Sequence, residues 1–197
     1  MEIENSGTLG RFDEVENFIS KNGDKWLDKL VDEYGESGLH RVSDTIKFHL
    51  PIVLSYLSIS NPKIPVNDLV AKKKILDLGC GATEPTDFKE NKRAHEPWLC
   101  RVLYGIGAHP IGIDIGDLSK EKFENYSLDL MKLNSLKFLK KHSIDLAHER
   151  LFINPLGTSP TLMDKYPQKI RFKRIDELIK QLHRIVKPEG YLVHNES

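Results

Sequence analysis

Carboxylates stand at the ends of three short apolar segments in the second half of the chain. Asp77 lies in segment 74–78, just before a glycine turn at 79–81, while Asp114 ends segment 110–114 and Asp129 lies in segment 126–130. Apolar segments that alternate with helical patterns predict parallel strands joined by right-handed crossovers. Ligands of such sheets bind beyond the carboxyl ends of the strands. We therefore expect the glycine turn and the three carboxylates to meet at one ligand-binding edge.

The composition of the glycine turn indicates which ligand it accepts. A dinucleotide pyrophosphate needs free backbone N–H groups and a third small residue, but Glu84 occupies the third glycine position of that pattern. Asp77 adds a second negative charge just before the turn. These charges oppose a pyrophosphate and therefore disfavour a nicotinamide oxidoreductase. A zwitterionic ligand with cationic groups suits the turn better.

The segment ILDLGCG at 75–81 resembles the first motif of the class I S-adenosylmethionine-dependent methyltransferases. The resemblance continues through Asp114, which matches the family's ribose-binding acid. It also includes Asp129, at the position whose side chain accepts a hydrogen bond from the adenine amino group. It ends with segment 185–192, which is similar to the family's last helix–turn–strand. The resemblance implies S-adenosyl-L-methionine as cofactor, with Asp77 supporting its ammonium group. The cofactor-binding residues it implies are Asp77, Gly79, Cys80, Gly81, Asp114, Ile115, Asp129 and Leu130.

The resemblance also implies the fold. We expect an α/β, doubly wound, mostly parallel five-stranded sheet in the order 3-2-1-4-5, formed by residues 67–197, and a helical N-terminal extension over residues 1–66. The usual last antiparallel strand pair of the family is lacking from the sequence. The last strand, at 191–194, is therefore expected at an exposed edge, unless the N-terminal segment, a second copy of the chain (a homodimer) or a partner protein covers it.

Helical periodicity predicts the other elements. In the extension, one helix covers 12–19, Asn22 and Gly23 interrupt it, and a second begins at Asp24. Pro51 is expected to kink or split a third helix. A short helix at 133–139 and an amphipathic helix at 175–185 follow, and 187–190 forms a turn before the last strand.

His148 and Glu149 stand at the carboxyl end of the fourth predicted strand, at 144–148, where many members of the family hold residues that face the methyl acceptor. Methyl transfer is an in-line displacement in which the enzyme positions the acceptor and removes its proton where necessary. His148 and Glu149 are therefore the candidate catalytic residues. The sequence 154–156 only partly matches the asparagine motif of amino-group methyltransferases and is interpreted as a loop turn. The polar insertion at 82–96 is either a solvated loop or a flap over the site.

Charge and composition limit the partners. The 197 residues carry 29 Lys and Arg against 29 Asp and Glu, a formal net charge of +0, so nucleic acid is an improbable partner. No segment is long and apolar enough to span a membrane, and two cysteines form no disulfide framework, which favours the cytoplasm. Cys80, Cys100 and eight histidines show no metal-binding spacing. We expect a methyltransferase that acts on a small molecule or a protein; the alternative is a non-catalytic cofactor-binding module or a subunit whose partner completes the substrate site.

Overall fold

The structure, a computed structural model, describes residues 6–35, 39–82, 96–150 and 167–195. Its centre is a five-stranded sheet in the order β3-β2-β1-β4-β5, in which all neighbouring strands are parallel. The sheet confirms the predicted strand order. The strands are β1 (Lys74–Leu78), β2 (His109–Asp114), β3 (Glu124–Ser127), β4 (Ile144–Arg150) and β5 (Val186–Asn195).

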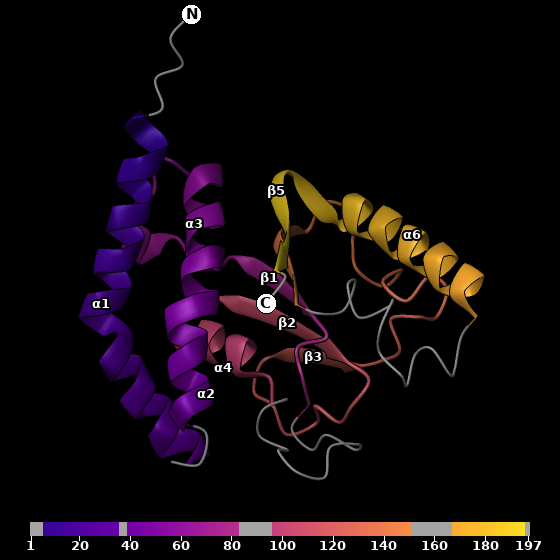
Figure 1. Cartoon of the computed structure of the whole chain (residues 1–197), viewed down its shortest axis with the longest axis horizontal. Coiled ribbons are helices and arrows are strands. Elements are labelled where there is room, and N and C mark those ends of the chain that lie inside the picture. Colours follow the sequence, from indigo (N-terminus) through magenta and orange to yellow (C-terminus); the bar gives the residue numbers. More distant parts are fainter. Residues whose placement is uncertain (1–5, 36–38, 83–95, 151–166, 196–197) are drawn as a thin grey trace, which may run out of the picture.

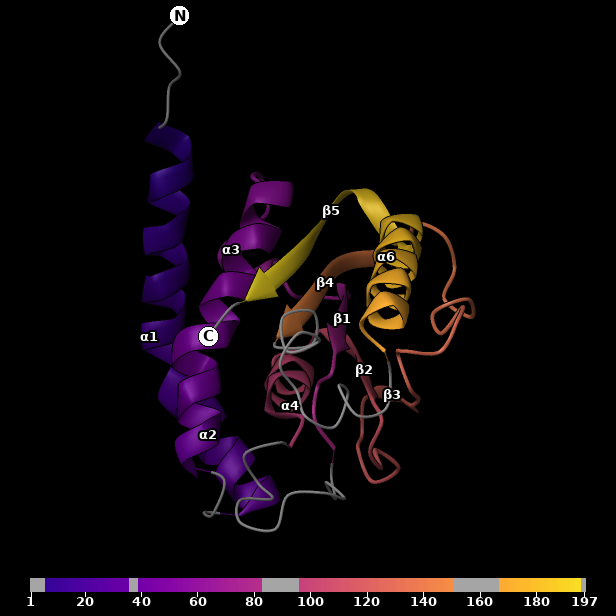
Figure 2. The same cartoon turned by 45° about the vertical axis from the view of Figure 1, so that its right-hand side comes forward.

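Helices cover both faces of the sheet, as a doubly wound fold requires. Helices α1 (Ser6–Tyr34) and α3 (Leu50–Ser60) lie on one side and α6 (Gln168–Ile185) on the other (Figures 1 and 2). Alternate residues of β1 face these two layers: Ile75 joins the core under α1 and α3, whereas Leu76 and Leu78 join the core under α6. The N-terminal helices therefore share one hydrophobic core with the sheet. None of the described helices is long and apolar enough to cross a membrane.

Helix α1 corrects the predicted interruption at Asn22 and Gly23, because it is continuous over 29 residues. Asn22 donates its side-chain amide to the carbonyl of Phe18, 2.8 Å away and one turn earlier, so it stays within the helix. Gly23 faces Ile46, whose Cγ2 would lie 3.4 Å from an added Cβ. The glycine thus serves close helix packing, and the gain from tertiary packing exceeds its weak helix propensity.

The segment after α1 contains three consecutive helical elements. Helix α2 (Leu39–Asp44) continues into a π-helical turn, η2 (Thr45–His49), and then into α3. Pro51 stands in the first turn of α3, where its missing N–H breaks no bond within that helix. The kink or split expected at Pro51 takes the form of a change in helical pitch at η2, and the helical backbone continues from η2 into α3 without a break.

Two connections complete the sheet. Helix α4 (Trp98–Gly105) joins β1 to β2 and lies on the face of α1 and α3. The helix predicted at 133–139 is wrong, because this stretch consists of turns with bonds from Lys137 N to Asn134 O and from Leu139 N to Leu136 O. Asn134 has a φ of 58°, a left-handed conformation that ends a right-handed helix. Leu136 and Leu139 still reach the core under α6.

The last helix and strand follow each other directly. Helix α6 is longer than the predicted 175–185, and β5 begins at Val186. The register against β4 jumps from Val186 opposite Ile144 to Tyr191 opposite Leu146, so the predicted turn at 187–190 is an irregularity within β5. An added Cβ at Gly190 would lie 2.6 Å from the carbonyl oxygen of Asp145, which explains why a glycine stands there.

Candidate functional site

A row of residues crosses the centre of the sheet near its carboxyl edge. Asp77 of β1 lies opposite Gly112 of β2 on one side and His148 of β4 on the other. Because all three lie at equivalent positions of parallel strands, their Cα–Cβ directions agree, and they face the layer of α3 and α4. The row therefore places a carboxylate and an imidazole side by side beneath the glycine turn.

Asp77 and His148 are paired. The Asp77 Oδ1 lies 2.8 Å from His148 Nδ1, and the two residues are 3% and 1% exposed. The thiol of Cys100, on α4, lies 3.6 Å from the second carboxylate oxygen, Oδ2. An ionised carboxylate only accepts hydrogen bonds, so an ionised Asp77 pairs with the ring tautomer that carries its hydrogen on Nδ1.

The second ring nitrogen of His148 has no hydrogen-bond partner among the described residues, although it is buried. The ring of His49, the last residue of η2, makes a T-shaped contact with the ring of His148 at a centroid distance of 6.2 Å. Most buried polar atoms are satisfied, so an unpaired buried nitrogen calls for an explanation. In a neutral ring protonated on Nδ1, this Nε2 atom carries a lone pair and is a base.

Glu149 is separated from this row by the alternation of side chains along β4. It is fully buried, it pairs with His194 of β5, and it lies on the face of Ala147, which belongs to the core under α6. The two predicted catalytic candidates therefore face opposite sides of the sheet.

The glycine turn after β1 is fixed to the end of β2. Gly79 and Gly81 have φ angles of 68° and 94°, which glycine adopts without strain. The backbone N–H groups of Gly79 and Cys80 donate to the carbonyl of Ile113 at 2.8 and 3.2 Å. The N–H of Gly81 donates to Asp114 Oδ2 at 3.0 Å. These N–H groups thus have partners within the protein.

Asp114 joins the two loops of the candidate site. Besides the bond from Gly81, its Oδ1 accepts from the N–H of Gly116 at 2.9 Å. Gly116 is a site residue that the sequence reasoning missed: an added Cβ there would lie 2.3 Å from the Cβ of Ala82. The spacing of Gly116, two residues after the strand-end acid, was the available signal. Ile115, between them, is 68% exposed.

Asp129 and Leu130 follow β3, which ends three residues earlier than the strand predicted at 126–130. Asp129 is half-buried, and its Oδ1 accepts from the N–H of Met131 at 2.9 Å. Leu130 is buried in the core under α6. The side chain of Asp129 thus shapes the turn after β3, next to the strand that carries Asp114.

The two cysteines meet under the glycine turn. An added Cβ at Gly112 would lie 3.0 Å from the sulfur of Cys80 and 3.3 Å from that of Cys100, so this glycine makes room for both. Burial raises the pKa of the Cys100 thiol well above its ordinary value. A hydrogen bond with Cys100 lowers the pKa of Cys80, but burial and the charges of Asp77 and Asp114 outweigh it and raise that pKa. Both thiols are therefore poor nucleophiles.

A buried ionic cluster supports the loop after β2. Arg101 of α4 donates from Nε and Nη2 to the two carboxylate oxygens of Glu121, at 3.1 and 2.6 Å, and also to Glu96. Its guanidinium lies over the rings of both Tyr34 and Trp98, at 4.1 and 4.5 Å from their centroids. The cluster connects α1 and α4 to the loop that begins at Ile115.

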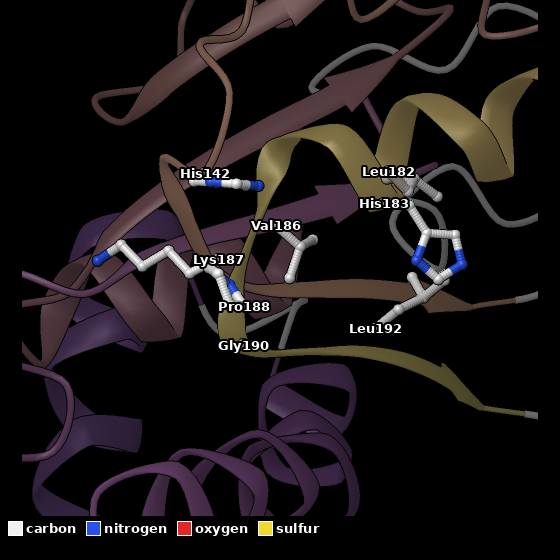
Figure 3. A pocket seen from close by; sticks show the side chains of 8 residues that line it. All are labelled: His142, Leu182, His183, Val186, Lys187, Pro188, Gly190 and Leu192. Atoms are coloured by element: carbon white, nitrogen blue, oxygen red, sulfur yellow. The ribbon is translucent and has the colours of Figure 1, made fainter.

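A cavity of about 320 Å³ lies elsewhere, between the end of α6 and the irregular part of β5. In Figure 3, His142 and Lys187 line one end and His183 and Leu192 the other. His142 precedes β4, so the cavity lies towards the amino end of that strand, and it shares no residue with the predicted site.

Two predicted features lie outside the described residues. These are most of the insertion at 82–96, of which only Ala82 and Glu96 are described, and the sequence at 154–156. The interpretations of both segments remain predictions.

The strand order, the parallel pairing and the helices on both faces of the sheet give the chain a doubly wound, Rossmann-like α/β fold. Neither a protein-family model nor a curated protein matches the chain. Solved structures with partial similarity exist, but their TM-scores are all below 0.5, so the fold assignment rests on the sheet itself.

One of these structures is the trans-methyltransferase CalH in complex with SAH (14% identity, TM-score 0.37), which covers 91% of this chain and 51% of CalH. A second is a candidate S-adenosyl-L-methionine-dependent methyltransferase from Methanococcus maripaludis (12%, 0.33), with 80% of this chain and 62% of that one covered. A third is a candidate methyltransferase from Thermobifida fusca YX (17%, 0.29), with 75% and 59% covered. The chain thus spans about half to three fifths of their lengths.

Proposed function

We propose that this chain is an S-adenosyl-L-methionine-dependent methyltransferase whose cofactor lies across the glycine turn at the carboxyl edge of the sheet. The observation that supports it most is the carboxylate of Asp114, which joins the glycine turn to the loop after β2. A carboxylate offers about four lone-pair positions, so two backbone bonds leave capacity for the two hydroxyls of a ribose.

The residues present fit such a cofactor better than a dinucleotide. Gly79, Cys80 and Gly81 donate their N–H groups to β2 and Asp114, so these three groups are not available to a pyrophosphate. Positive φ angles at both glycines let the backbone come close to the amino-acid part of the cofactor. Asp77 and Asp114 supply negative charge, which suits a ligand that bears a sulfonium and an ammonium group.

In this proposal the chain positions the cofactor and the methyl acceptor, and the cofactor supplies the reactive methyl group. The glycine turn holds the methionine part, with the charge of Asp77 beneath it. Asp114, flanked by Ile115, accepts the ribose hydroxyls, and Asp129, with Leu130, holds the adenine. A side chain at the end of β4, His148 or Glu149, removes a proton from the acceptor where the acceptor carries one.

Isothermal titration calorimetry tests the proposal. SAH should bind the wild-type chain, and Asp114→Ala should weaken the binding by about ten- to a hundredfold, the effect of losing charge-assisted hydrogen bonds. Asp176→Ala is the matched control, because Asp176 lies on the exposed face of α6 and its carboxylate pairs with Lys180 of the same helix. Equal affinities of Asp114→Ala and wild type would refute the site. Tight binding with no transfer of a labelled methyl group to any acceptor would favour a non-catalytic binding module.

A further inference from the structure

The feature that carries this inference is the pair Asp77–His148. Its Nδ1–Oδ1 bond of 2.8 Å is buried, and the other nitrogen, Nε2, has no partner among the described residues. A surface carboxylate–histidine pair needs no function, but a buried basic nitrogen without a partner forfeits a hydrogen bond that water would supply. Such an atom marks a place where a ligand group completes the structure.

We propose that His148 is the general base of the transfer, that Asp77 is its positioning residue, and that the acceptor is a hydroxyl compound. The inference rests on the proposed function. It assigns Asp77 to the imidazole of His148 in addition to the charge that Asp77 places beneath the glycine turn. It also selects His148 over Glu149, whose carboxylate is already paired with His194 on the opposite face of the sheet.

The tautomer follows from the partner. Asp77 accepts a hydrogen bond from the N–H at Nδ1, so the lone pair of the neutral ring lies on Nε2. Protonation of Nε2 would place a second N–H in a buried position without an acceptor among the described residues. The carboxylate therefore holds the ring in the basic tautomer and orients it, and it stabilises the imidazolium that forms when the ring takes a proton. The same division of roles operates wherever a buried carboxylate orients a basic histidine.

The acceptor class follows from the need for a base. A neutral hydroxyl is a weak nucleophile and gains most from losing its proton as the new bond forms. Nε2 takes the hydroxyl proton, the oxygen bonds to the methyl carbon, and the carbon–sulfur bond breaks with its electron pair remaining on sulfur. The products are a methyl ether, the uncharged sulfide form of the cofactor and imidazolium His148.

The groups around the ring are consistent with a reaction site. The ring of His148 faces Asp77 on β1 and His49 on η2. The thiol of Cys100, on α4, contacts the carboxylate of Asp77. On β5, the residue opposite His148 is the apolar Val193. None of these described groups is a lysine or an arginine. His49 ends a π-helical turn, and π-helical turns are frequent at functional sites.

NMR of the full-length chain labelled with nitrogen-15 tests the positioning without any activity measurement. Long-range proton–nitrogen spectra at pH 7.5 should show a histidine with Nδ1 protonated and Nε2 unprotonated, whose signals disappear in His148→Gln and remain in His183→Gln, a change on the exposed face of α6. Asp77→Asn should shift the proton towards Nε2, and Asp77→Glu should restore the original tautomer. A protonated Nε2 in the wild type, or the same tautomer in Asp77→Asn, overturns the inference.

Phenol and toluene test the acceptor class, because they differ by one hydroxyl at nearly constant shape. In the presence of SAH, phenol should shift the Nε2 signal of His148 and toluene should not. With S-adenosyl-L-methionine, the wild type should methylate phenol, and His148→Gln should do so at least 100-fold more slowly with an unchanged Kd for SAH. Equal effects of the two probes, no effect of phenol, or equal transfer rates overturn the hydroxyl assignment. Failure of SAH to bind at all refutes the proposed function instead, and the tautomer measurement still decides the pair.

Discussion

The carboxylate of Asp77 and the imidazole of His148 lie at opposing positions on neighbouring parallel strands, 71 residues apart in sequence and 2.8 Å apart in space. Both side chains are buried, and only Nδ1 of the ring has a partner among the described residues. This pair lies beneath the glycine turn, and the proposed chemistry of the chain depends on it.

Removing Asp77 should destabilise the fold. Asp77→Ala leaves the Nδ1 proton of His148 buried without its acceptor, which costs about 1–3 kcal/mol of unfolding free energy. Urea denaturation measures the loss, with Asp176→Ala as the surface control, which should stay within about 0.5 kcal/mol of the wild type. An Asp77→Ala variant as stable as this control would contradict the buried pair.

Gly116 should be intolerant of a side chain. An alanine Cβ there would lie 2.3 Å from Ala82, so the two loops must separate and Asp114 must lose its bond to Gly81 or Gly116. We expect Gly116→Ala to weaken SAH binding at least tenfold, which corresponds to about 1.4 kcal/mol.

Gly105→Ala is the matched control for Gly116→Ala. Gly105 ends α4, and nothing lies within 4 Å of an added Cβ. Its replacement should leave SAH affinity unchanged and raise stability slightly, because alanine favours the helix. If both alanine variants bind SAH as the wild type does, the two loops do not form the cofactor site.

The buried guanidinium of Arg101 should contribute strongly to the free energy of unfolding. Arg101→Leu leaves the carboxylates of Glu96 and Glu121 without their shared cation, and breaking a buried ion pair in this way costs about 3–5 kcal/mol. The exposed pair Lys180–Asp176 is the comparison, and Lys180→Ala should cost less than about 0.5 kcal/mol. Equal effects of the two changes on urea denaturation would contradict the role of the cluster.

The buried thiol of Cys100 should make the stability of the folded protein fall at alkaline pH. Burial raises the pKa of Cys100 well above its ordinary value of 9.0. Above that pH the unfolded chain loses the thiol proton while the folded chain keeps it, so stability falls as pH rises, by up to about 1.4 kcal/mol per pH unit.

Cys100→Ala should show a shallower loss of stability between pH 9 and 10.5 than the wild type, measured as urea midpoints. Burial also raises the pKa of Tyr34, but this contribution is common to both proteins and does not affect the comparison. Identical slopes would contradict a protonated, buried Cys100. For the same reason iodoacetamide should modify the native thiols much more slowly than the unfolded ones.

The sheet was predictable because its signals are local. β1 and β2 lie in short apolar runs that periodicity indicates, whereas β3 is polar. The order of the sheet was expected from the resemblance of the motifs around Asp77, Asp114 and Asp129 to those of a known family. Elements that depend on tertiary packing were not predicted correctly. Gly23 stays helical because α1 packs against Ile46, and Leu136 reaches the core from a turn that Asn134 initiates.

The pairings of side chains within the candidate site could not be predicted from the sequence. Sequence reasoning placed Asp77 and His148 at neighbouring strand ends, but their contact depends on the register of β1 against β4, which the hydrophobic pattern alone does not specify. The separation of Glu149 from His148 follows from the same register. The spacing of Gly116 after Asp114 could have marked it as a site residue, but neither loop indicates that Ala82 lies against it.

A crystal structure of the chain grown with SAH tests the central claim most directly. We predict that SAH lies across Gly79–Gly81, with its ribose hydroxyls on the carboxylate of Asp114 and its sulfur on the side of the turn that faces His148. SAH bound elsewhere, for example in the cavity between α6 and β5, or a glycine turn without ligand in crystals saturated with SAH, would contradict the account.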